Sequence, residues 1–135
     1  MTIEEILKSD ALAQFGAIML EQSKQRTERK YQALNEITPK GRVVFAGDSI
    51  VEQFPLCEFF GDCIYNRGIS GDTSGEMLRR LQNTVLPLKP EKVLIWIGTN
   101  DLQNEIKPTE IAENVRQSGE RLQKECGSKI CILSV

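Results

Sequence analysis

Residues 42–50 read RVVFAGDSI, a short apolar run that ends at Gly47 and is followed by Asp48 and Ser49. A continuous apolar run closed by glycine is typical of a strand buried on both faces of a parallel sheet. Similar runs occur at residues 63–66, 93–97 and 130–135. We therefore predict four buried strands, with Ser49 placed just past the carboxyl end of the first.

Helical patterns separate these runs. One follows residues 72–74, and another begins near Pro108, with apolar or small residues on one face of each: Met77, Leu78 and Leu81, then Ile111, Val115, Ser118 and Leu122. Strands that alternate with helices favour a parallel sheet covered on both faces. The fold class predicted is α/β, a three-layer α/β/α sandwich.

The first part of the chain has a different pattern. Residues 3–37 read as helix, with apolar positions three and four apart, a break that Ser9 or Asp10 could cap, and an end at Pro39 and Gly41. We divide the chain into a helical arm, residues 1–38, and an α/β domain, residues 39–135. The arm could pack on the sheet or on a neighbour, or serve as a lid or a dimer contact.

Composition narrows the function classes. The 135 residues suit one domain, and 17 basic against 19 acidic residues argue against a nucleic-acid partner. No apolar run is long enough for a membrane span, and residues 1–10 lack the pattern of a signal peptide, so the cytoplasm is the expected location. There is no histidine, which removes the commonest general base.

The cysteines form no C-x-x-C pair, and without histidine they predict no metal site. Cys63 and Cys131 lie in apolar runs, where we expect them to be small buried hydrophobic residues.

Polar residues follow three of the predicted strands, at residues 47–49 (GDS), 66–73 (NRGISGDT) and 98–101 (GTND). Since the carboxyl ends of parallel strands share one edge, these segments should meet there. They would bring together a hydroxyl, a glycine-rich turn and a carboxamide, which are the groups that acyl transfer needs. Each segment alone also fits a turn or a helix cap.

In this interpretation Ser49 attacks an ester carbonyl, and three donors stabilise the resulting oxyanion: the backbone N–H groups of Ser49 and Gly71 and the side-chain amide of Asn100. Gly47 allows the sharp turn into a helix that begins at Ser49, and Gly71 would let a substrate approach the backbone closely.

Residues 45–50, 66–74 and 97–101 resemble blocks I, II and III of the SGNH hydrolase superfamily, the GDSL-like lipases and acylhydrolases. The residues of blocks II and III are especially similar to the bacterial thioesterase/lysophospholipase and platelet-activating-factor acetylhydrolase branches. The resemblance implies a flavodoxin-like sheet of order 2-1-3-4-5, a nucleophile at Ser49, oxyanion donors at Gly71 and Asn100, a small ester or acyl substrate, and neither metal nor organic cofactor.

The resemblance stops before the family's Asp-x-x-His block, which follows a fifth strand. The chain reaches Val135 in the predicted fourth strand and has no histidine, so the triad Asp and His are absent from it. We therefore expect a truncated chain that is inactive alone, because a serine without its base is a weak nucleophile. An unpaired fourth-strand edge, or the helical arm, could mediate homo-oligomerisation.

Four more polar residues flank the three segments. We expect the Asp48 carboxylate to cap backbone donors, and Asn66, Asp72 and Asp101 to support the turns around the site rather than to contact substrate. The aromatic group Phe54, Phe59 and Phe60, with Leu56, is predicted to be core, with a partial role in an acyl pocket as the alternative.

Two alternatives to an esterase stay open. One is a non-catalytic α/β binding or interaction module that keeps the pocket without the chemistry, and the other is a nucleotide-binding domain. No G-x-G-x-x-G or P-loop lysine follows the first strand, which disfavours nucleotide binding. Acyl lipid, acetylated sugar and thioester all fit as substrates, because specificity depends on loops and pocket shape.

Overall fold

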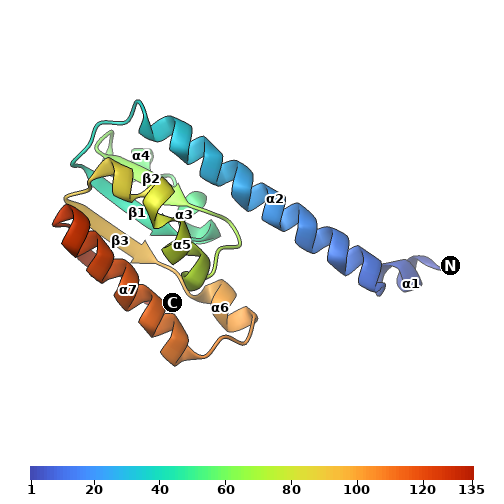
Figure 1. Ribbon diagram of the computed structural model, residues 1–135. Coiled ribbons are helices and arrows are strands. Elements are labelled where there is room, and N and C mark those ends of the chain that lie inside the picture. The colour runs from blue at the N-terminus through green and yellow to red at the C-terminus, as the bar shows by residue number, and fades with distance from the viewer.

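The computed structural model describes residues 1–135 as a four-stranded parallel sheet flanked by helices (Figure 1). The strands are β1 Val43–Gly47, β2 Ile64–Gly68, β3 Lys92–Trp96 and β4 Lys129–Ile132, in the order β2-β1-β3-β4. The α/β fold predicted from the sequence is confirmed, and so is the order of these four strands.

The register of the sheet aligns the ends of its central strands. Gly47, the last residue of β1, pairs with Gly68 at the end of β2 and with Trp96 at the end of β3. The segments that follow these three strands therefore leave the sheet at one edge, on the right in Figure 1.

The two faces of the sheet are covered unequally. On one face α5 (Ser74–Thr84), the 3₁₀ turn η1 (Leu86–Leu88) and α7 (Pro108–Cys126) enclose a cluster of 10 buried residues that includes Val44, Leu81 and Leu122. On the other face the short helices α3 (Ser49–Glu52) and α4 (Leu56–Phe60) cover a cluster of 3: Phe45, Val51 and Leu56. Burial of the larger cluster supplies most of the hydrophobic stabilisation of the sheet.

The prediction that the aromatic group after Ser49 belongs to the core is wrong for two of its members. Leu56 is buried and Phe54 is half-buried, but Phe59 and Phe60 are exposed. The two rings pack against Phe54 and against each other at the outer side of α4, which has only 5 residues and turns one side to the sheet.

The first 35 residues form two helices, α1 (Ile3–Leu7) and α2 (Asp10–Asn35). The break between them lies where expected, and the Ser9 hydroxyl accepts a hydrogen bond from the Leu12 N–H as the cap of α2. The second half of α2 lies along the α/β domain, whereas its first half extends with α1 well beyond the sheet (Figure 1). None of the helices combines the length and the hydropathy that a membrane crossing requires.

β4 is shorter than predicted and is largely exposed, because it is the last strand of the sheet and pairs only with β3. The prediction that Cys131 and Cys63 are buried is wrong. Cys131 lies on this edge strand, and Cys63 precedes the first paired residue of β2. α6 (Thr99–Gln103) completes the structure just after β3.

Candidate functional site

The end of β1 leads directly into α3, with Ser49 as the first helical residue. Gly47 is required by packing, since an added Cβ would lie 2.0 Å from the carbonyl oxygen of Trp96 on β3. Asp48 is the N-cap, and its carboxylate accepts a hydrogen bond from the N–H of Ile50 at 2.9 Å. The expectation that Asp48 caps backbone donors is confirmed.

The side chain of Asp48 is buried. Its second carboxylate oxygen has no hydrogen-bond partner, and burial raises the pKa of the Asp48 carboxyl above its ordinary value. Ser49, by contrast, is partly exposed at the edge of the sheet. Its N–H is at the start of α3, outside the hydrogen-bond ladder of the helix. Asp48 thus orients the first turn that presents Ser49.

The end of β2 is fastened to α3 by side chains. Asn66 donates from Nδ2 to the carbonyl of Val51 at 2.6 Å and accepts from the Gly68 N–H at 3.0 Å. The Glu52 carboxylate accepts from the Ser70 N–H at 2.7 Å and also from the Ser70 hydroxyl. These contacts hold the loop after β2 beside the helix that begins at Ser49.

Gly71 has a backbone φ of +85°, a conformation that favours glycine. We expected its missing side chain to admit a substrate, but the structure gives a different reason. An added Cβ would lie 2.9 Å from Leu20 Cδ1 and 3.0 Å from Lys24 Cε, so α2 occupies that side. The Gly71 N–H makes no hydrogen bond to another backbone group and is free to donate.

The end of β3 is joined to the same loop. Asn100 donates from Nδ2 to the carbonyl of Asp72 at 3.0 Å, which uses one of its two amide hydrogens. Asp101 is fully buried and accepts from the N–H and the hydroxyl of Ser74, at 2.8 and 2.5 Å. Asp101 therefore caps the start of α5 and ties it to α6.

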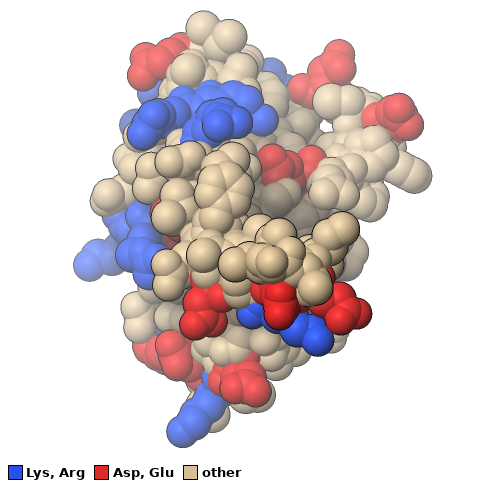
Figure 2. All heavy atoms as spheres, turned by 90° about the vertical axis from the view of Figure 1, so that its right-hand side faces the viewer, with Lys and Arg blue, Asp and Glu red and all other residues tan.

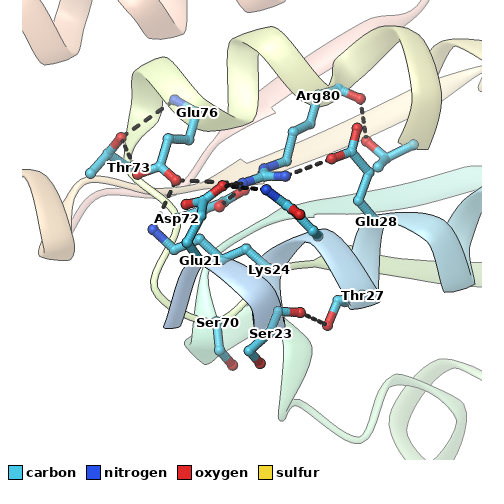
Figure 3. A network of polar contacts seen from close by, with 12 residues as sticks. Glu21, Ser23, Lys24, Thr27, Glu28, Ser70, Asp72, Thr73, Glu76 and Arg80 are labelled. Carbon is cyan, nitrogen blue, oxygen red and sulfur yellow. Dashed lines mark hydrogen bonds and ion pairs between the residues drawn. The ribbon is translucent and has the colours of Figure 1, made fainter. Parts of the chain in front are cut away.

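Asp72 belongs to a buried ionic network between α2 and α5 (Figure 3). Its carboxylate lies 3.3 Å from Nε of Arg80, and Arg80 also pairs with Glu28 of α2 at 2.6 Å. Lys24 of α2 pairs with Glu76 of α5 at 2.8 Å. Burial raises the pKa of Asp72 to about 7, although the nearby Arg80 charge opposes that shift.

Sequence reasoning missed this network. Its members repeat at helical spacing on two segments, Lys24 with Glu28 and Glu76 with Arg80. That spacing is equally typical of a solvated helix surface, so it gave no sign that the two helices face each other.

The three predicted segments thus lie together, through side-chain contacts between successive loops. Ser70 and Glu52 join the second segment to α3, and Asn100 joins the third to the second. Figure 2 views this side of the molecule and shows a hollow whose wall includes acidic groups. The segments that carry Ser49, Gly71 and Asn100 therefore leave the sheet at one edge, and the chain contains no imidazole.

Known proteins resemble this chain in both sequence and fold. Alpha1, a platelet-activating factor acetylhydrolase IB subunit from Rattus norvegicus, is 38% identical over 65 residues, which are 44% of this chain and 28% of that protein. A structure from Streptococcus pneumonia described as a platelet activating factor superposes with a TM-score of 0.86 at 32% identity, over 94% of this chain and 62% of the other.

A GDSL-like lipase structure from Bacteroides thetaiotaomicron superposes with a TM-score of 0.68 at 29% identity, over 78% of this chain and 56% of the lipase. The chain thus spans less than two thirds of the length of each of these relatives. The profile of the GDSL-like Lipase/Acylhydrolase family matches residues 45–134, which include the end of β1, the other three strands and the three segments 47–49, 66–73 and 98–101. The chain belongs to the GDSL-like Lipase/Acylhydrolase family.

Proposed function

We propose that the protein is a serine acylhydrolase of carboxylic esters, with Ser49 as nucleophile. The observation that supports the proposal is the set of donors on the segments that leave the sheet at the same edge as Ser49. The Gly71 N–H has no backbone acceptor, the Ser49 N–H is at a helix start, and Asn100 Nδ2 is held by the carbonyl of the residue after Gly71. Donors fixed in this way can stabilise an oxyanion without reorganising.

In the proposed reaction the Ser49 oxygen bonds to the ester carbonyl carbon, and its proton passes to a base. The carbonyl oxygen becomes the oxyanion and accepts from Ser49 N–H, Gly71 N–H and Asn100. Collapse of the tetrahedral intermediate breaks the bond between the carbonyl carbon and the alcohol oxygen. The alcohol leaves with the proton that the base had accepted. Water then attacks the acyl-serine, and the acid is released as Ser49 regains its proton.

This chain does not supply the histidine that would accept the Ser49 proton, because it contains no histidine. In a well-studied serine protease, loss of the histidine or the serine lowers turnover about 10⁶-fold. We therefore propose that these 135 residues alone turn over esters very slowly. The name of the rat relative favours an acetyl ester as the substrate class, with acyl lipids and thioesters as the other candidates.

The test is phosphonylation of the full 135-residue chain by a fluorophosphonate, read by peptide mass spectrometry, with and without added imidazole. Imidazole replaces the missing base, so it should accelerate adduct formation at Ser49. Ser49→Ala should abolish that adduct, and Asn100→Ala should slow it about 10²-fold. An adduct that forms equally fast on other serines, or none at Ser49 with imidazole present, would contradict the proposal.

A second candidate is a binding module that uses the same site without chemistry. The absence of histidine favours it. A ligand would then bind at this edge of the sheet, while Ser49 stayed unlabelled at every imidazole concentration. The same experiment therefore separates the two functions.

A further inference from the structure

The N-terminal arm, meaning α1 and residues 10–20 of α2, exposes apolar side chains that the chain itself does not cover. Phe15 is 60% exposed, Ile18 56% and Met19 46%. Three large apolar residues on one segment of a surface helix are unusual unless something else covers them. The question is which partner does so.

The α/β domain does not cover these apolar side chains. Tyr31 and Asn35 of α2 are buried against the domain, and Leu20 and Lys24 contact Gly71. At about 100° per residue, Phe15 and Ile18 lie roughly 140–160° around the helix from Tyr31, and Met19 lies about 120° from it. The apolar side of the arm therefore faces away from the chain's own core.

The charges on α1 and α2 are divided along the chain. At the arm's tip α1 carries the exposed Glu4 and Glu5, with Lys8 just after it, and none of the three forms an ion pair. Beyond the apolar residues the helix carries Arg26 and Arg29, also without ion pairs, on the same outward side. The chain thus runs from an acidic tip on α1, through the outward apolar residues of α2, to a basic outward segment of the same helix.

Two copies of such a surface are complementary when they pair in antiparallel orientation. A twofold axis near residues 15–18 would bring the apolar residues of two copies together and place the acidic tip of each against the basic segment of the other. In Figure 2 the arm points toward the viewer, and its uncharged atoms are bordered on the lower side by acidic groups and a basic group. An acidic tip also disfavours an anionic lipid surface as the partner.

We propose that the protein forms a homodimer through antiparallel pairing of α2 from two copies, centred on Phe15, Ile18 and Met19. The contact does not depend on the esterase proposal. The first test is sedimentation of the full chain between about 1 and about 200 μM, which should show a reversible monomer–dimer equilibrium. A chain that stays monomeric over this range would overturn the proposal.

The apolar contact is tested by a matched pair of variants. Phe15→Glu with Met19→Glu should raise the dimer dissociation constant at least about 100-fold, with an unchanged thermal unfolding curve in the dilute monomer. Ile132→Glu, at an exposed position on the β4 edge, should leave the dimer intact. The opposite pattern, in which only Ile132→Glu dissociates the dimer, would assign the contact to the sheet edge and overturn the proposal.

The antiparallel direction is tested by charge. Arg26→Glu with Arg29→Glu makes both ends of the contact acidic, and Glu4→Arg with Glu5→Arg makes both ends basic. Each double variant should lose self-association, and an equimolar mixture should form a heterodimer at low salt. Self-association that survives in both variants, or a mixture that stays monomeric, would contradict the pairing.

Discussion

The two halves of α2 differ in which side chains face the domain and which face solvent. In the second half the polar side chains face inward, with Lys24 paired to Glu76 and Asn35 bonded to the carbonyls of Asn83 and Thr84. In the first half, Phe15 and Ile18 face solvent. The comparison teaches that the side on which a helix is apolar does not locate its protein contact when ionic and hydrogen-bonded pairs hold the helix.

Tyr31→Ala tests the docked half, and we expect the largest effect there. Tyr31 is 4% exposed, and its hydroxyl donates to the carbonyl of Gly68 at 2.6 Å. Removing the ring leaves a cavity and an unpaired carbonyl at the end of β2, so the free energy of unfolding should fall by about 4–5 kcal/mol. Urea denaturation with two-state analysis measures it.

Tyr31→Phe is the control, since it keeps the ring and removes only the hydroxyl. It should cost about 1 kcal/mol. If Tyr31→Ala lowered the free energy of unfolding by less than about 1 kcal/mol, the docking of α2 on the domain would be wrong.

The sheet and its end segments were predictable from sequence because their signals are local. Continuous apolar runs closed by Gly47 and Gly98 indicated the strands, and the turn at residues 47–49 placed Asp48 as a cap. The exposure of Cys131 was not predictable in this way. Whether an apolar strand is covered depends on its neighbours in the sheet, and β4 has only one.

The surroundings of the candidate site were harder to predict, because they depend on contacts between distant segments. Nothing near residue 71 in the sequence indicated that Leu20 and Lys24 would lie against it. Nor did the charge on Arg80 indicate that it would be buried beside Asp72 rather than solvated. Both contacts follow from the position of α2, which no local pattern specifies.

The pH dependence of stability tests the ionic network that docks the second half. The pKa of Asp72 is raised from 3.8 to about 7 in the folded chain, so the folded state binds its proton more tightly than the unfolded state does. Its contribution to stability is therefore fully present below about pH 4 and is lost as pH rises through about 7. Relative to Asp72→Asn, the wild type should lose on the order of 3 kcal/mol between those values.

Urea denaturation of both proteins at intervals from about pH 4 to about pH 8 gives this difference directly. Asp62→Asn, at an exposed carboxylate, is the control and should give a curve parallel to the wild type. A wild type that gained stability relative to Asp72→Asn over this range would mean that the Arg80 charge outweighs burial.

Phe15→Ala tests the projecting half, and we expect the smallest effect there. The side chain is 60% exposed, and alanine is the better helix former, so the free energy of unfolding of the dilute monomer should change by less than about 0.5 kcal/mol. The same aromatic-to-alanine change, 16 positions apart on one helix, would then differ about tenfold in its cost. A loss above about 1 kcal/mol in dilute solution would mean that the ring packs on its own chain. If the loss appears only at concentrations where the chain associates, Phe15 stabilises the contact between chains and not the fold of one.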